Sequence, residues 1–514
     1  MSQTKETALT PLSPSLQANV HAIFTRFGGS SDLVVRLFRS DAAPHRELAL
    51  LYINGLVDAD AINESVLAPM MSLSLPPYMD DKGDGLLESF RACVVSIGAV
   101  KEIVTLEAAL QNMADGLCLI LADGSAMGLM ACVGGGNQRP VGIAQTQTVI
   151  RGPQNSFVED IETNMSLIRR IIRSSDLHVQ KHKIGRQTQT NVAVLHIDGI
   201  ADEEIVKEVY RRLAVIDIDG ILESGYIEEF IQDETFTMFP TLLNTERPDT
   251  VAASLLEGRV AVLVDGTPIA LIAPTTFFSF FHSPEDYYQR FDIASFVRTI
   301  RYVAYVVSML FPALYIAVTT FHQEMLPTTL LISLAAQREG VPFPGLVEAL
   351  LMEMTFEVLR EAGLRMPRAI GPAISIVGAL VLGQSAVQAG IVSAGMVIVV
   401  SFTAISNFVM PEFNMAATSR IIRFGIMIMA GILGFFGIFI SVLFVLIHLV
   451  SLRSFGVPYM SPFAPGSKGS GMLRDVFIRI PWWAAVLRPL DMKLRNPKRQ
   501  KNAKRPVFQR HSDK

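Results

Sequence analysis

The sequence predicts an α/β protein joined to an α-helical membrane protein: two tandem homologous cytosolic α/β subdomains, followed by a polytopic transmembrane helical domain. Two observations lead to this fold class. The first 290 residues contain an internal repeat, and long apolar runs without charge follow residue 300. Charged residues make up 18% of the 514 residues, whereas an average soluble protein has about 25%. The formal charge of −4 favours no general attraction to nucleic acid.

The N-terminal residues predict a cytosolic start for the chain. The opening stretch, MSQTKETALTPLSPSLQANV, lacks the apolar segment of a signal peptide, and we expect residues 1–15 to be flexible. The three cysteines, Cys93, Cys118 and Cys132, are odd in number and have no metal-ligand spacing. They indicate a reducing compartment without a disulfide framework.

Comparison of the chain with itself reveals the repeat. Leu48–Asp58 (LALLYINGLVD) recurs 144 positions later as Val192–Asp202 (VAVLHIDGIAD). Ser30–Leu33 (SSDL) recurs at the same offset as Ser174–Leu177. Two independent matches at one offset indicate a duplication.

A third match sets the extent of the two copies. Gly116–Met130 recurs as Gly258–Ile272, at an offset of 142. We therefore expect two homologous subdomains, at 16–150 and 160–290, joined by a turn-rich connection.

Each copy has the pattern of a mixed α/β fold. An amphipathic helix comes first (Leu16–Phe27 and Ile161–Ile172), then an apolar strand, then further helices such as Glu203–Ala214. Each copy closes with two apolar runs around Asp123-Gly124 or Asp265-Gly266. Asp-Gly between β-rich runs predicts a hairpin, because glycine accepts the positive φ of such turns. We therefore interpret the repeated aspartates as turn residues rather than as ligands.

Other candidate chemistry in the soluble half is weak. Asp217–Gly220 (DIDG) begins like a calcium loop but lacks the later oxygen ligands. His178 and His182 fall in a predicted strand, where residues four apart are distant, which disfavours zinc. No local set of residues suggests a catalytic triad. We expect no enzyme activity, no catalytic residues, no cofactor and no metal site.

The second half predicts a membrane domain at 296–455. The run Tyr302–Phe321 carries no charge, and about 20 residues at about 1.5 Å per residue cross a hydrocarbon core of about 30 Å. The spans that we expect are at about 302–321, 369–388, 391–411 and 424–452. Cytosolic termini require an even number of crossings, four in this prediction and six as the alternative.

A broken or re-entrant region at 325–361 interrupts these spans, because Pro327, Pro342 and Pro344 end helical ladders there. Its last helix carries acids four residues apart, on one face. Two interpretations of these acids stay open: they line an ion vestibule, or they lie on a solvated interfacial face. The polar residues of the later spans are interpreted either as interhelical contacts or as the lining of a water-filled path. The candidate ion-path residues are Glu353, Glu357, Glu361, Gln384, Gln388 and Asn407.

The C-terminal segment 474–514 predicts contact with membrane lipids. Trp482 and Trp483 lie beside arginines, as in an interfacial segment. The tail from Lys493 to Lys514 is strongly basic. A basic run after a membrane helix favours anionic headgroups over nucleic acid as the partner.

Several motifs in fixed order carry a family resemblance. The longest is Pro312–Ala373, which begins PALYIAVTTFHQEMLPTTLLISLAAQREGVPFPG. The upstream motifs are Arg151-Gly152-Pro153, Ile216–Tyr226 (IDIDGILESGY), Asn244–Asp249 (NTERPD), Leu255–Gly266 (LLEGRVAVLVDG) and Ser283–Phe291 (SPEDYYQRF). From about residue 15 to 460 the chain resembles the bacterial spore germination protein A family, the A subunits of GerA-type germinant receptors.

This resemblance implies a subunit of a receptor in the spore inner membrane, with its large N-terminal region and C-terminal tail on the cytosolic, spore-core side. The implied partners are a transporter-like B subunit, a lipoprotein C subunit and further copies of this chain. The implied function is a response to nutrients that triggers germination, with this subunit as an oligomeric ion-conducting component. The alternatives are a sporulation-stage paralogue, a self-sufficient secondary transporter and a membrane-anchored enzyme.

Overall fold

The computed structural model describes residues 10–40, 43–72, 87–88, 90–91, 100–133, 135, 142–144, 146–366, 381–463, 473–488 and 494–500. The chain divides into two compact units. The α/β unit comprises Met1–Gln232, Leu242–Pro274 and Trp482–Lys514. The helical unit comprises Asp233–Thr241 and Thr275–Pro481.

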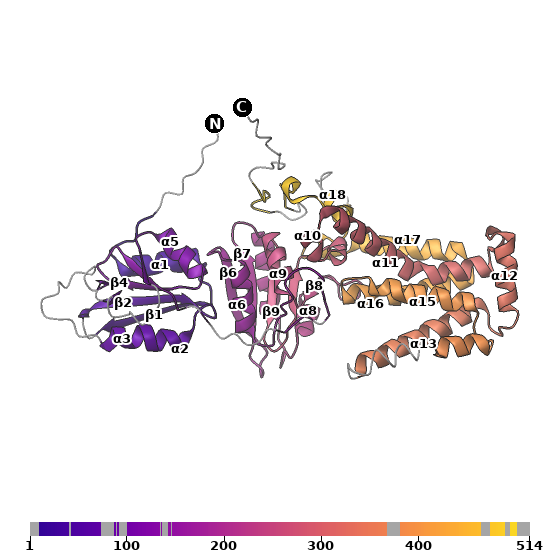
Figure 1. The fold of residues 1–514 in the computed structure, drawn as a ribbon, viewed down its shortest axis with the longest axis horizontal. Coiled ribbons are helices and arrows are strands. Elements are labelled where there is room, and N and C mark those ends of the chain that lie inside the picture. Colours follow the sequence, from indigo (N-terminus) through magenta and orange to yellow (C-terminus); the bar gives the residue numbers. More distant parts are fainter. Residues whose placement is uncertain are drawn as a thin grey trace, which may run out of the picture. The chain divides into compact units, whose positions relative to one another are not determined.

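The α/β unit contains two antiparallel five-stranded sheets (Figure 1). The first has the order β1-β2-β4-β5-β3 and the second β6-β7-β9-β10-β8, so both have the same topology. The strands of the first are β1 (Leu33–Ser40), β2 (Ala43–Ile53), β3 (Val100–Ile103), β4 (Cys118–Ala122) and β5 (Gly128–Ala131). Those of the second are β6 (Leu177–Ile184), β7 (Thr190–Ile197), β8 (Leu243–Thr245), β9 (Val260–Val264) and β10 (Ala270–Ala273). We call the two halves subdomain 1 and subdomain 2.

The strand register keeps the offsets of the sequence repeat. Leu33 pairs with Ile53 in the first sheet, and Leu177 pairs with Ile197 in the second. Each pair lies 144 positions from its counterpart. The two copies therefore match in strand pairing as well as in sequence.

The predicted Asp-Gly hairpins join β4 to β5 and β9 to β10. Gly124 and Gly266 have φ values of +83° and +87°, as such turns require. The Asp123 carboxylate accepts from the Leu16 amide (3.2 Å), and the Asp265 carboxylate accepts from the Ile161 amide (3.3 Å). These aspartates thus bind helix N-termini in both copies, which confirms their structural interpretation.

Helices flank each sheet, and they include those predicted at Leu16–Phe27, Ile161–Ile172 and Glu203–Ala214. Those of subdomain 1 are α1 (Leu16–Arg26), α2 (Ala59–Ile62), the π-turn η1 (Asn63–Leu67), α3 (Ala68–Ser72) and α5 (Leu106–Ala114). Those of subdomain 2 are α6 (Ile161–Ile171), α7 (Glu203–Val215), α8 (Ser224–Ile231) and α9 (Pro248–Leu256). Asp58 and Asp202, also 144 apart, are the N-caps of α2 and α7.

A buried ion pair joins the subdomains. Arg169 of α6, 2% exposed, donates to Asp32 at 2.8 and 3.0 Å and to the Ser30 hydroxyl at 2.9 Å. The amide of Ser31 donates to the carbonyl of Val179 (2.8 Å). Because β6 is an edge strand, the first SSDL motif covers an edge that would otherwise be unpaired.

Two predicted boundaries are wrong. Residues 10–15 are packed rather than flexible, since Leu12 is 3% exposed and its amide donates to the Val104 carbonyl (2.9 Å); residues 1–9 lie outside the described part. Subdomain 2 ends at Pro274 rather than at 290. The aromatic turn η2 (Phe277–Phe281) is buried against Tyr305 of the helical unit.

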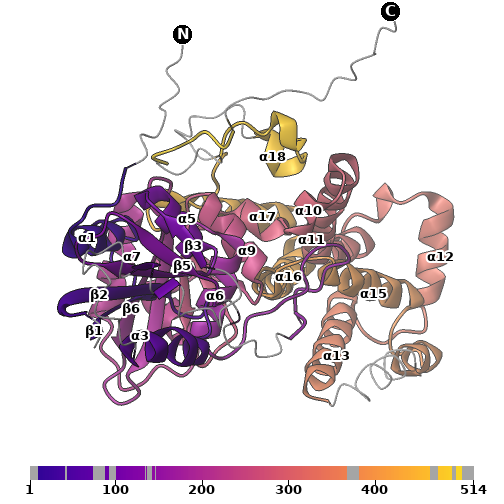
Figure 2. The same cartoon turned by 60° about the vertical axis from the view of Figure 1, so that its left-hand side comes forward.

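The helical unit packs α11 against α15, α16 and α17 (Figures 1 and 2). Its elements are α10 (Glu285–Tyr288), α11 (Phe291–Thr320), η3 (Gln323–Met325), α12 (Thr328–Arg338), α13 (Gly345–Arg365), α15 (Ala394–Phe408), α16 (Phe413–Leu433), α17 (Phe435–Ser451) and α18 (Leu473–Phe477). Of the described helices, α11 and α16 are long and apolar enough to cross a bilayer, while α15 and α17 are shorter apolar helices. The number of crossings stays a prediction.

The structure corrects part of the span assignment. The predicted span 302–321 falls in α11, but 424–452 is not one helix: α16 ends at Leu433, and Gly434, with φ +60°, starts α17. The span 391–411 is α15, whose 15 residues cover only about 22 Å. Residues 369–380 of the span 369–388 lie outside the described residues, and 381–388 are helical.

The predicted break in 325–361 is present, because α12 and α13 are separate helices. The placement of Trp482 and Trp483 at a lipid interface stays a prediction. Trp482 onward belongs to the α/β unit, and the Arg499 guanidinium lies 5.5 Å from the Trp482 ring. Arg495 and Arg499 of this basic segment form ion pairs with acidic residues of subdomain 2.

Candidate functional site

Two of the three acids that lie four residues apart on α13 face arginines of α16. Glu353, 1% exposed, lies 2.8 Å from a guanidinium nitrogen of Arg423. Glu357 accepts from Arg420 at 2.7 Å and lies 3.4 Å from Arg423. Within the described part of the chain, Glu361 pairs with Arg365, one turn further along the same helix, at the surface. The helical period therefore places two of the three predicted acids against arginines of α16.

Asn407 of α15 joins the same cluster. In the amide orientation that satisfies its neighbours, it accepts from Arg360 (2.7 Å) and donates to the Ser419 hydroxyl (3.1 Å). Arg423, 1% exposed, also donates to the Ser308 carbonyl of α11 (3.3 Å). One polar network thus connects α11, α13, α15 and α16.

The network contains three of the six predicted ion-path residues: Glu353, Glu357 and Asn407. Gln384 and Gln388 are exposed, and Glu361 lies outside the network. Three arginines, Arg360, Arg420 and Arg423, face two glutamates, which leaves a formal charge of +1. The isolated chain therefore presents no net negative site here, and a role in an ion path stays a prediction.

Sequence reasoning missed the arginines of this network. Arg420 and Arg423 are three residues apart, so they share a helix face, as do the acids opposite them. Glu348 was also missed. Its side chain is fully buried, accepts from the Ser393 amide (2.6 Å), and lies 4.0 Å from Arg338.

Such a network holds the helices in one arrangement. Removing one partner of a buried pair costs about 3–5 kcal/mol, because a charge is left uncompensated. Charged groups between apolar helices persist only where they have a partner or reach water. The network is therefore a place where a change of partners would change the helix packing.

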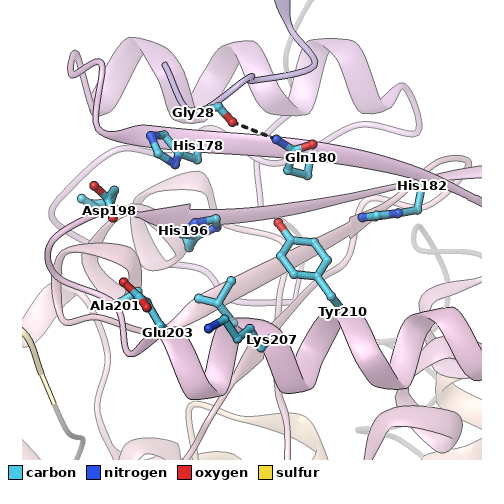
Figure 3. Close-up of a pocket in the computed structure, with 12 residues that line it drawn as sticks. Gly28, His178, Gln180, His182, His196, Asp198, Ala201, Glu203, Lys207 and Tyr210 are labelled. Carbon is cyan, nitrogen blue, oxygen red and sulfur yellow. Dashed lines mark hydrogen bonds between the residues drawn. The ribbon is translucent and has the colours of Figure 1, made fainter. Parts of the chain in front are cut away.

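A second candidate site is a pocket in subdomain 2 (Figure 3). Its volume is about 470 Å³, and it lies between the β6–β7 face and α7. Figure 3 shows imidazoles, a phenol, an amide and an ammonium group around it. These belong to His178, His182, His196, Tyr210, Gln180 and Lys207.

Burial keeps two of these side chains neutral near pH 7. Burial, together with the neighbouring His178, lowers the pKa of His196 to about 4. Burial raises the pKa of Tyr210 to about 12. The rings of His178 and His196 are 5.4 Å apart, edge to face. Those of His182 and Tyr210 are 5.3 Å apart.

Two buried polar atoms in this pocket, His196 Nδ1 and Tyr210 Oη, have no hydrogen-bond partner among the described residues. Buried polar groups are nearly always paired, so these two are available to a bound molecule. The arrangement suits a small polar ligand with both donors and acceptors. Over the described part of the chain, no cluster of three His, Cys, Asp or Glu could hold a metal ion.

Comparison with known proteins identifies the family. Residues 21–490 match the family model described as Bacillus/Clostridium GerA spore germination protein. The chain is 48% identical over 497 residues to spore germination protein KA of Bacillus subtilis (strain 168), covering 96% of this chain and 90% of that protein. It is 40% identical over 478 residues to spore germination protein B1 of the same organism, covering 92% and 96%.

A solved structure also matches, the N-terminal domain of the A subunit of the Bacillus megaterium spore germinant receptor GerK3. The identity is 38% and the TM-score is 0.43, over 52% of this chain and 98% of that one. The family match covers both the α/β unit and most of the helical unit. On that match and the identities to the two Bacillus subtilis proteins, the chain belongs to the GerA family of spore germination proteins.

Proposed function

We propose that this chain is a membrane subunit of a spore germinant receptor complex, which responds to nutrients and triggers germination. The observation that carries the proposal is the family match over residues 21–490, together with relatives named as spore germination proteins. In this proposal the chain acts in the spore inner membrane as an oligomeric, ion-conducting component. It is not an enzyme, and it has no nucleic-acid partner.

Exposed apolar side chains support a membrane location. They lie on α11, α15, α16 and α17, and the described part of the chain does not cover them. Examples are Phe296, Val303, Ile398, Ile405, Ile421, Phe439 and Phe444, which are 55–73% exposed. Apolar surface of this extent is unusual for a soluble monomer and fits contact with lipid or with further copies of the chain.

The charged network of the helical unit supports a role in ion movement. Charges between apolar helices are costly and often mark ion paths. We take the paired arrangement of Glu353 and Glu357 with Arg420 and Arg423 as the closed form. Separation of these pairs would expose the carboxylates to cations, as acidic rings do in cation channels.

The partners in this proposal are a transporter-like B subunit and a lipoprotein C subunit. Both the α/β unit and the C-terminal tail lie on the cytosolic side. A sporulation-stage paralogue would have the same architecture. A self-sufficient transporter would have paired broken helices in matching positions, and uptake of a labelled nutrient by the purified chain alone would favour it.

The test is cation flux through the purified chain in liposomes, with and without the partner subunits. Glu357→Gln removes a carboxylate from the network and should reduce flux, most clearly at low ionic strength where screening is weak. Glu361→Gln is the matched control, because it removes the same charge from the surface of the same helix. Equal flux from the two variants at every ionic strength would refute the ion path. Spores that carry Glu357→Gln and germinate normally would contradict its role in germination.

A further inference from the structure

The C-terminal segment forms an ordered hairpin in the α/β unit. We call residues 482–488 and 494–500 the tail hairpin. Its two arms are joined by backbone contacts, including a hydrogen bond from the Arg488 amide to the Pro497 carbonyl (2.8 Å). The Arg488 guanidinium donates to carbonyls of the opposite arm as well. The basic tail is therefore a folded element at least as far as residue 500.

Opposite charges join the tail hairpin to one end of subdomain 2. Arg495 lies 2.7 Å from the Glu203 carboxylate and 3.6 Å from that of Asp198. Arg499 lies 3.4 Å from Glu257. Two cations of the hairpin thus face three acids, which lie after the end of β7, at the start of α7 and at the end of α9.

Two close contacts fix the position of the hairpin. The Arg488 guanidinium donates to the Leu256 carbonyl (2.8 Å), the last residue of α9, where the helix dipole favours a cation. Leu494 lies over Gly258, so closely that a Cβ at this glycine would be 2.3 Å from its side chain. The absence of a side chain at Gly258 lets the hairpin approach.

In subdomain 1, the residues equivalent to this interaction surface contact subdomain 2. Asn54, the counterpart of Asp198, donates to Glu162 of α6 (3.1 Å). Asp115, the counterpart of Glu257, lies 3.7 Å from Arg173. The tail hairpin therefore occupies on subdomain 2 the position that subdomain 2 occupies on subdomain 1.

This end of subdomain 2 also borders the pocket lined by His178, His182 and His196, which we call the histidine pocket. Asp198 and Glu203 line the pocket, and Figure 3 shows both at one end of it, with His182 at the other. Arg495 binds these two carboxylates in the docked hairpin. The hairpin and any molecule that enters at this end therefore use the same acids.

We propose that Asp198, Glu203, Glu257 and Gly258 form an interaction surface for the chain's own tail hairpin, and that the docked hairpin restricts entry to the histidine pocket. Arg495, Asp198 and Glu203 are all 57% exposed in these ion pairs. Exposed pairs are individually weak and are screened by salt. The docking is therefore reversible, and release of the hairpin opens the pocket.

The test uses the full-length protein in detergent micelles. Hydrogen exchange of peptides that contain Arg488 and Arg499 reports hairpin opening, and the rate at which diethyl pyrocarbonate modifies His178 reports access to the pocket. Arg495→Glu should raise both rates about fivefold at low salt, since it replaces an attraction by a repulsion. Lys498→Glu makes the same charge change elsewhere on the hairpin and should leave both rates near those of the parent.

The charge exchange Arg495→Glu with Glu203→Lys should restore both rates. In the unaltered protein, both rates should rise with salt. The interaction surface is overturned if Arg495→Glu behaves like Lys498→Glu, or if the exchange restores nothing. If the hairpin opens while His178 is modified no faster, the restriction of the pocket is overturned.

Discussion

Subdomains 1 and 2 share strand order and register but differ on one sheet face. In subdomain 1 this face packs Phe38 and Tyr52 against a buried apolar cluster that includes Val66. The counterparts 144 positions later are His182, His196 and Tyr210, which line the pocket. The same backbone therefore holds a closed core in one copy and a polar pocket in the other. The comparison teaches that the fold fixes where a site is possible, whereas a few side chains decide whether it exists.

The largest expected difference concerns the two SSDL motifs. Asp32→Asn leaves the buried Arg169 guanidinium without its counter-charge and should lower the free energy of unfolding of the α/β unit by about 3–5 kcal/mol. Asp176→Asn, at the exposed counterpart position, should change it by less than about 0.5 kcal/mol. Urea unfolding followed by circular dichroism measures both. Equal losses would show that the two motifs play the same role.

The second largest expected difference is a pH dependence of the free energy of unfolding, which only the pocket face of subdomain 2 should show. The folded state lowers the His196 pKa to about 4, so it disfavours the proton that the unfolded chain binds below about pH 6.5. Stability is therefore complete above about pH 6.5 and should fall by up to about 3 kcal/mol as the pH drops towards 4. His196→Gln should remove most of this fall, measured as unfolding free energy against pH, and the part due to His178, whose pKa burial also lowers, should remain. Tyr52 at the counterpart position does not titrate in this range, so it gives subdomain 1 no equivalent pH-dependent contribution to stability. An unchanged pH profile in the variant would contradict the burial of a neutral imidazole.

A smaller effect is expected from the phenols. Tyr210→Phe removes a buried hydroxyl that has no partner among the described residues and should stabilise subdomain 2 by about 1 kcal/mol. Tyr52→Phe, at a partly exposed position, should be nearly neutral. Thermal unfolding of the two variants compares them directly. A loss of stability in Tyr210→Phe would mean that its hydroxyl is paired in solution.

The smallest effect is expected at the hairpin glycines. Alanine at Gly124 or Gly266 must adopt a positive φ, which costs about 1 kcal/mol. At Gly124 the new Cβ would also displace the Arg46 guanidinium, at 2.5 Å, whereas at Gly266 nothing lies within 4 Å. Gly124→Ala should therefore cost a few tenths of a kcal/mol more. A larger loss at Gly266 would indicate a contact of that turn absent from the isolated chain.

Local patterns predicted the frame of the molecule well. The 144-residue offset anticipates the pairing of Leu33 with Ile53 and of Leu177 with Ile197, because strand register follows the apolar alternation. The charge-free run after Tyr302 anticipates the second part of α11. These features depend on neighbours in sequence, so the sequence alone specifies them.

The parts that failed depend on backbone conformation or on residues distant in sequence. Hydropathy treats 424–452 as one apolar run, since the positive φ of Gly434 leaves the mean hydropathy unchanged. Arg423 has the pattern of an interfacial residue until Glu353, on another helix, supplies its partner. The pocket could not be found from His178 and His182, because His196 and Tyr210 complete it from a second strand and a helix.

The cover that residues 30–32 place on the edge of β6 has a consequence for synthesis of the chain. Subdomain 1 leaves the ribosome first, and domains fold in that order as they emerge. When β6 follows, the loop that pairs with its edge is already in place, and so is Asp32 for the side chain of Arg169. A nascent strand with an open edge is prone to pair with other chains. Because subdomain 1 is synthesised first, it covers the edge of β6 while subdomain 2 folds and so protects that edge from pairing with other chains.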